Sequence, residues 1–317
     1  MSVEEIMMRE YTIDSGKGGD PVVIAQLSDF HINYCDDADT AEANPTIEAT
    51  RINRFWLADA VSVERIRPQL AYAATWADQM VVTGDALDYL SIGALRLLKE
   101  EVWDKYPGIL ITNGNHDYIQ VMSNNFASPT IPMVAETKSL EERYAMMQAG
   151  WSHDVIYTSK VVKDKVLVVA MDNGRHCFLD EEVEPLKRDI ALAREKGYTV
   201  LLFFHESVYT NNPAEEHVDA LRADDHGWEK DQDFYRNSAN HFVGSPNDPP
   251  ESANARIMDL IFHNADVIKG VFNGHAHEDF YTEIAAYTPD GEPRFIPQVT
   301  MTGSIYGKGH IVKITVV

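Results

Sequence analysis

The chain has 317 residues, 44% of them hydrophobic, which suffices for one large domain with a substantial core. Acidic side chains outnumber basic ones by 50 to 27, and the formal charge of −23 repels polyphosphate backbones at long range, so long nucleic acid is not an expected partner. The two cysteines, without a CxxC pattern, exclude a disulfide framework and a thiolate zinc site.

Strand-like runs alternate with helix-like segments, which predicts a single layered α/β domain over residues 1–317. In chain order, we expect strands at 22–27 and 80–83, a helix at 92–105, a strand at 109–112, a helix after the capping box at Ser139, a strand at 166–171, a helix at 181–196, a strand at 200–204, a helix at 252–264 and a strand at 267–272. After residue 280, short alternating strands surround turns and end at 311–316. These last strands are expected to pair mostly antiparallel and to close a second sheet against the first.

Two acidic stretches, 33–50 and 206–250, are rich in Asn, Asp and Pro and longer than ordinary connections. Long loops beside a site are commonly lids or substrate walls. A surface insertion without such a role is an equal alternative, and both interpretations stay open.

Five polar motifs each follow a strand-like run, so their side chains emerge at strand ends that can converge on one edge of a sheet. Carboxylate, amide and imidazole groups of this kind are ligands for a hydrolytic centre with two metal ions, and they suit Mn, Fe, Zn, Co or Ni. Residues two apart in an extended segment point to the same side, as D-x-H and H-x-H spacings require. The motifs are Asp29-Phe30-His31, Gly84-Asp85, Gly114-Asn115-His116-Asp117, His205 and Gly274-His275-Ala276-His277.

Asp85 is the expected bridge between the ions, because Gly84 before it lets the backbone turn sharply at the strand end. Two divalent ions, the carboxylates of Asp29 and Asp85 and a bridging hydroxide leave about one positive charge when the histidines are neutral. Such a centre favours an anionic phosphate.

The order D-x-H, GD, GNH-D/E, H, GH-x-H resembles that of the calcineurin-like metallophosphoesterase family, over residues 29 to 277. The resemblance implies a four-layer α/β/β/α sandwich of two mixed sheets flanked by helices. It further implies that His116 protonates the leaving oxygen, that Asp117 orients or supports that imidazole, and that a metal-bridging hydroxide attacks phosphorus in line. It implies two ligand sets that share Asp85: Asp29, His31, Asp85 and His277 for one ion, and Asp85, Asn115, His205 and His275 for the other.

Details of the motifs indicate which branch of the family this sequence resembles. His31 stands where purple acid phosphatases have glycine, and Asp88-Tyr89 are displaced from the position of their tyrosine ligand, which argues against a tyrosinate–iron(III) centre. The pattern is closer to the cyclic-nucleotide phosphodiesterase branch. We therefore expect a metal-dependent enzyme, with manganese or iron among the candidate ions, that hydrolyses a small phosphodiester or phosphomonoester. The alternatives are a non-catalytic scaffold with the same fold and a phosphoprotein phosphatase.

Arg175 and His176 follow the strand-like run 166–171, so they can reach the same sheet edge and contact substrate. The other histidines lack a partner motif and receive no role. No run approaches the roughly 20 apolar residues of a membrane helix, and residues 1–9 lack the apolar core of a signal peptide. We expect a cytoplasmic protein that does not engage membranes; the oligomeric state is open.

Overall fold

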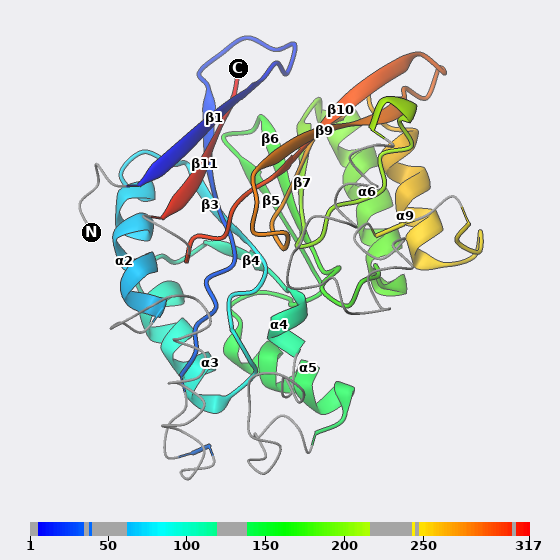
Figure 1. Cartoon of the computed structure of the whole chain (residues 1–317). Coiled ribbons are helices and arrows are strands. Elements are labelled where there is room, and N and C mark those ends of the chain that lie inside the picture. The colour runs from blue at the N-terminus through cyan, green and yellow to red at the C-terminus, as the bar shows by residue number, and fades with distance from the viewer. Residues whose placement is uncertain are drawn as a thin grey trace.

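Two mixed β-sheets pack face to face, and helices cover their outer faces (Figure 1). The structure is a computed structural model that describes residues 6–34, 38–39, 62–118, 138–215, 243–244, 247–305 and 309–317. The arrangement is the α/β sandwich that the sequence predicts. Among the described helices, none is both long and apolar enough to cross a membrane.

The first sheet has five strands in the order β1 (Met7–Ile13), β11 (His310–Val316), β2 (Val22–Leu27), β3 (Gln79–Thr83) and β4 (Leu110–Thr112). Strands β2, β3 and β4 are parallel, whereas β11 runs parallel to β1 and antiparallel to β2. Apolar residues of three helices pack on the outer face of this sheet. These helices are α2 (Ser62–Ala73), α3 (Ile92–Leu98), which continues into the π-helix η2 (Lys99–Trp103), and α5 (Leu140–Gly150).

The second sheet has six strands in the order β5 (Tyr157–Val162), β6 (Val166–Met171), β7 (Thr199–Phe203), β8 (Ile268–Asn273), β10 (Pro293–Thr300) and β9 (Phe280–Tyr287). The four inner strands are parallel, and the two edge strands are antiparallel to their neighbours. Helices α6 (Asp180–Lys196) and α9 (Ala253–Phe262) cover its outer face. Two short helices complete the described elements, α4 (Asn115–Tyr118) and η4 (Pro213–Glu215).

The core between the sheets follows from the two-residue period of the strands. In β7, Leu201 and Phe203 face the first sheet, while Val200 and Leu202 face the helices on the other side. Phe203 stacks on Phe272 of β8 with ring centroids 5.1 Å apart. Because β2, β3, β4, β7 and β8 are buried on both faces, their positions are fixed by packing, and so are the loops that leave their ends.

The strands and helices predicted up to residue 272 coincide with observed elements to within two residues at each end. The pairing predicted for the C-terminal strands is right for β9 with β10 but wrong for β11, which leaves this sheet and enters the first one. The reason is burial on both faces: Ile311 packs toward the helices, and Val312 and Ile314 pack toward the second sheet. Most of 33–50 and 206–250 lies outside the described residues, and so do the predictions made for these stretches.

Candidate metal centre

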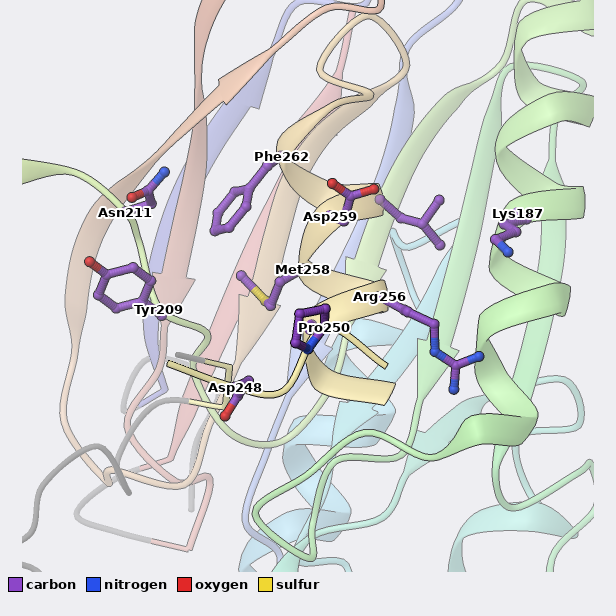
Figure 2. A pocket seen from close by; sticks show the side chains of 11 residues that line it. Lys187, Tyr209, Asn211, Asp248, Pro250, Arg256, Met258, Asp259 and Phe262 are labelled. Atoms are coloured by element: carbon purple, nitrogen blue, oxygen red, sulfur yellow. The ribbon is translucent and has the colours of Figure 1, made fainter. Parts of the chain in front are cut away.

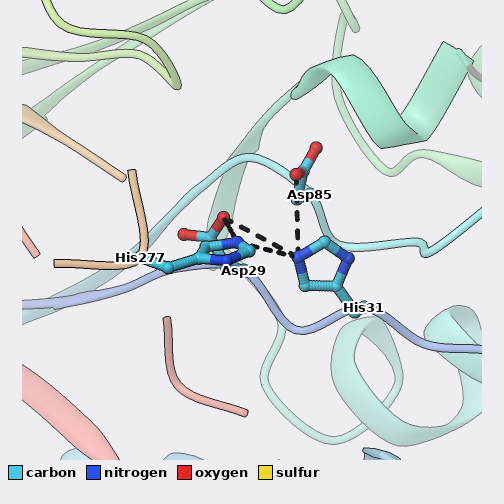
Figure 3. Close-up of side chains that lie close together, drawn as sticks. All are labelled: Asp29, His31, Asp85 and His277. Carbon is cyan, nitrogen blue, oxygen red and sulfur yellow. Dashed lines mark hydrogen bonds and ion pairs between the residues drawn. The ribbon is translucent and has the colours of Figure 1, made fainter. Parts of the chain in front are cut away.

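The loops after β2, β3 and β8 bring four predicted ligands into one cluster. Ligand atoms of Asp29, His31, Asp85 and His277 all lie within 4.8 Å of one another (Figure 3). His31 Nε2 is 3.7 Å from Asp85 Oδ2, and His277 Nε2 is 3.1 Å from Asp29 Oδ1. These are the four residues that the family resemblance assigns to one ion.

Asp85 also belongs to a second cluster, with His205 after β7 and His275 after β8. Ligand atoms of these three residues again lie within 4.8 Å of one another. Asn115, at the start of α4, joins them, because its Oδ1 is 3.1 Å from His205 Nε2 and 3.1 Å from His275 Nδ1. The structure thus brings all seven predicted ligands together, in two groups that share Asp85.

The tautomers of the histidines fit two cations. His205 Nδ1 is 2.8 Å from the carbonyl of Thr83, so that nitrogen donates to the backbone and Nε2 carries a lone pair toward the cluster. His205 Nε2 is 3.2 Å from His275 Nδ1, and in the other group His31 Nε2 is 3.2 Å from His277 Nε2. Two imidazole nitrogens at this distance share one hydrogen at most, whereas a cation between them satisfies both lone pairs.

Backbone strain is concentrated in the same residues. Among the described non-glycine residues, nine have a positive φ, and five of them are predicted ligands. An L-residue in this left-handed region costs roughly 1 to 2 kcal/mol, and such strain collects at functional sites. The five values are 52° at Asp29, 45° at His31, 47° at Asp85, 67° at His275 and 55° at His277.

Gly84 is required by the approach of two loops. Its φ is +83°, and a Cβ added there would lie 2.4 Å from His205 Nδ1. The glycine therefore lets His205 of the second sheet reach Asp85 of the first, to which its Nε2 comes within 3.3 Å.

The charges of the cluster attract a cation. Burial raises the pKa of Asp85, but attraction to the surrounding histidines, His205 foremost, outweighs burial and holds that pKa well below its usual range. Burial lowers the pKa of His31 to about 4, so this imidazole is neutral at pH 7, as a ligand must be. Burial also lowers the pKa of His205, yet the Asp85 carboxylate outweighs it and raises that pKa to about 10. Asp85 thus draws positive charge to this point, where a metal ion bound to His205 Nε2 would replace the proton that this raised pKa otherwise holds there.

The carboxylate beside His116 is Asp88, a residue that the sequence did not reveal as functional. Asp88 Oδ1 is 3.2 Å from His31 Nδ1 and 3.3 Å from His116 Nδ1, and the Asp88 carbonyl is 2.9 Å from the same His116 nitrogen. The His116 and His31 rings pack edge to face, with their centroids 4.6 Å apart. One buried acid thus contacts both a predicted ligand and the predicted proton donor. The sequence feature that could have identified Asp88 is its position three residues after Asp85, on the same loop.

Asp117 has contacts different from those expected. Its carboxylate accepts the backbone amides of Leu87 and Gly114, each at 2.7 Å, and so fastens the loop after β4 to the loop after β3. Both Asp117 oxygens accept backbone amides, and the carboxylate that contacts the His116 imidazole is Asp88. Orientation or electrostatic support of that imidazole by Asp117 stays a prediction.

His176 lies beside the second cluster. Its ring centroid is 6.2 Å from that of His275, and its Nδ1 is 2.8 Å from Glu206 Oε1. Glu206 is completely buried and directly follows the predicted ligand His205. Arg175 is exposed beside His176. The two predicted substrate contacts are therefore on the loop that borders the cluster.

A separate cavity of about 520 Å³ lies along α9, between this helix and the loop after β7 (Figure 2). Tyr209, Met258 and Phe262 give it an apolar wall, while Lys187 and Arg256 stand at its other side. None of the predicted ligands lines this cavity, so it is not part of the metal centre.

No protein-family model and no curated protein matches this chain. Among solved structures, a dimetal phosphatase from Danio rerio is similar at 12% identity, with 90% of this chain and 88% of that chain covered and a TM-score of 0.43. The calcineurin-like phosphoesterase YfkN from Bacillus subtilis shows 14% identity, 89% and 81% coverage and a TM-score of 0.35. The phosphopantetheinyl hydrolase PptH from Mycobacterium tuberculosis shows 12% identity, 89% coverage of both chains and a TM-score of 0.38.

At these TM-scores the similarity by itself establishes neither a shared fold nor a shared activity. The chemistry of this chain therefore follows from its own residues.

Proposed function

We propose that this chain is a calcineurin-like metallophosphoesterase that hydrolyses a small phosphodiester or phosphomonoester with two bound metal ions. The observation that carries the proposal is the pair of ligand clusters sharing Asp85. Asp29, His31 and His277 would complete one ion site with Asp85. Asn115, His205 and His275 would complete the other.

When bound, two divalent ions would acidify water to a nucleophile and neutralise phosphoryl oxygens. The chain holds the groups around that centre in place before substrate arrives. Asp88 fixes the His31 ring through Nδ1, and the backbone amide of His116 donates to Asp85 Oδ1 at 2.8 Å. The loop after β4 is thereby tied to the shared carboxylate.

His116 would protonate the leaving oxygen. Its Nδ1 is held by the carbonyl and carboxylate of Asp88, so Nε2 is the nitrogen that would give a proton to a substrate. A scaffold without activity does not need an imidazole fixed in this way, and this feature favours an enzyme over that alternative.

The proposal is tested by turnover of bis(p-nitrophenyl) phosphate and p-nitrophenyl phosphate, with manganese or iron supplied. We expect turnover that depends on the metal and is abolished in Asp85→Ala. The matched control is Asp290→Ala, an exposed acid in the turn between β9 and β10, which should leave turnover unchanged. Absence of metal-dependent turnover of both ester types would refute the proposal, and the ratio of the two rates separates diesterase from monoesterase.

A further inference from the structure

We propose that Arg175 forms a second anion-binding subsite beside the metal centre, and that the substrate therefore carries a second phosphate group besides the one that is cleaved. This inference rests on the proposed function, because it places the scissile phosphate at the two ligand clusters.

The loop that carries Arg175 is in backbone contact with the loop that carries Asn115 and His116. A Cβ added to Gly174 would lie 2.4 Å from the carbonyl carbon of Gly114, so no other residue fits there. Arg175 directly follows Gly174, and Asn115 directly follows Gly114. Because consecutive Cα atoms are about 3.8 Å apart, both residues lie one peptide unit from this backbone contact. The backbone of Arg175 thus lies beside the loop that carries the predicted ligand Asn115, and an arginine side chain is long enough to reach a substrate bound there.

A buried carboxylate locks the two loops together. Asp172 accepts the Gly174 amide at 3.1 Å and the Asn113 side-chain amide at 3.3 Å. It also accepts the hydroxyl of Tyr144 at 3.3 Å and that of Tyr118. The loop before Arg175 is therefore rigid, and its guanidinium is offered from a fixed base.

Arg175 hydrogen-bonds to a tyrosine and carries its charge in a strongly acidic protein. Within the described part of the chain, no ion pair between Arg175 and a carboxylate is found, and its side chain hydrogen-bonds to Tyr144. A guanidinium binds phosphate oxygens in pairs, with geometry that lysine does not offer. An exposed arginine held beside an anion-hydrolysing centre is thus suited to a phosphate of the substrate.

Arg143 favours a phosphate over a carboxylate as the second group. Its Nη1 donates to the carbonyl of Tyr118 at 2.8 Å, which places it beside α4, and Arg175 lies close enough to lower its pKa, after burial as the main cause. Two neighbouring guanidinium groups repel each other. A dianionic phosphate relieves that repulsion more than a singly charged carboxylate does.

The test compares two esters that differ only by the second phosphate. They are the p-nitrophenyl ester of thymidine 5′-phosphate and the same ester bearing a 3′-phosphate. We expect Arg175→Gln to lower kcat/KM by about tenfold to a hundredfold for the ester with the 3′-phosphate, as the loss of a charged hydrogen bond predicts. It should change kcat/KM for the other ester by less than about threefold, and Arg175→Lys should restore part of the loss. The matched control is Arg188→Gln on α6, an exposed arginine away from the clusters.

Binding gives a second readout that does not need turnover. Calorimetry should show that Arg175→Gln weakens binding of thymidine 3′,5′-bisphosphate more than that of thymidine 5′-phosphate, with and without metal. An equal loss for both esters, or no loss, overturns the inference while the proposed function stands. If the wild-type protein cleaves neither ester when manganese is supplied, the proposed function fails, and selective binding of the bisphosphate then tests Arg175 alone.

Discussion

Replacement of Asp88 by asparagine should weaken metal binding and slow the reaction, because one carboxylate serves two imidazoles. Asp88 is completely buried, and its Oδ1 lies 3.2 Å from His31 Nδ1 and 3.3 Å from His116 Nδ1. Asparagine keeps an oxygen that can accept the same hydrogen bonds but removes the charge, and charged hydrogen bonds are roughly twice as strong as neutral ones. The loss at His31 is then about 1 to 1.5 kcal/mol, or about tenfold in metal affinity.

Metal affinity is measured by competition with a chelator. The kcat is then measured at saturating metal, so that weaker metal binding no longer contributes and only the loss of charge beside His116 affects the rate. Asp189→Asn is the matched control, because Asp189 is also buried and accepts a hydrogen bond, from Tyr157 at 2.8 Å, but lies on α6. Unchanged metal affinity together with unchanged kcat in Asp88→Asn would refute the role given to this carboxylate. An equal effect in Asp189→Asn would show that the loss comes from general destabilisation.

Three further predictions concern the proton donor, the loop geometry and the surface. His116→Gln should keep both metal ions by elemental analysis while kcat falls by about 10²- to 10⁴-fold; a loss of metal would instead make His116 a ligand. Gly84→Ala should retain one ion instead of two after dialysis, because its Cβ would displace His205; retention of two ions contradicts the close approach. Glu101→Gln should lower the free energy of unfolding by about 1 to 2 kcal/mol at pH 7, because bonds from Arg67 at 2.8 Å hold the Glu101 pKa at about 2, and solvent screening reduces the full effect. Since this folded-state pKa lies below the ordinary value of 4.5, the stabilisation is present above pH 4.5 and is lost as the pH falls to about 2; an unfolding difference from wild type that does not change with pH would contradict it.

The sequence predicted the places of the ligands because each motif follows an apolar run that is buried on both faces. Parallel pairing puts the ends of β2, β3 and β4 at one edge of the first sheet and those of β7 and β8 at one edge of the second. The face-to-face packing of the two sheets then brings these two edges together. The family resemblance implied the membership of the cluster in Figure 3 and of the second cluster, and the glycine before Asp85 suggested its shared role.

The contacts around the ligands were not predictable in the same way. Asp88 follows the Gly84-Asp85 motif, Asp117 ends the motif that begins at Gly114, and both are buried. Only the fold decides that Asp88 contacts the imidazoles while Asp117 accepts backbone amides. Glu206 likewise acquires its partner His176 through the packing of two loops that are distant in sequence. Placement of β11 in the first sheet is also a long-range result, since its alternating pattern suits either sheet.

The account depends most on two cations sharing Asp85, and anomalous diffraction from crystals soaked in manganese tests this directly. We expect two peaks about 3.5–4 Å apart, one beside Asp29, His31 and His277 and one beside His205 and His275, with the Asp85 carboxylate between them. A soaked crystal with no peak between Asp85 and these histidines would contradict the account.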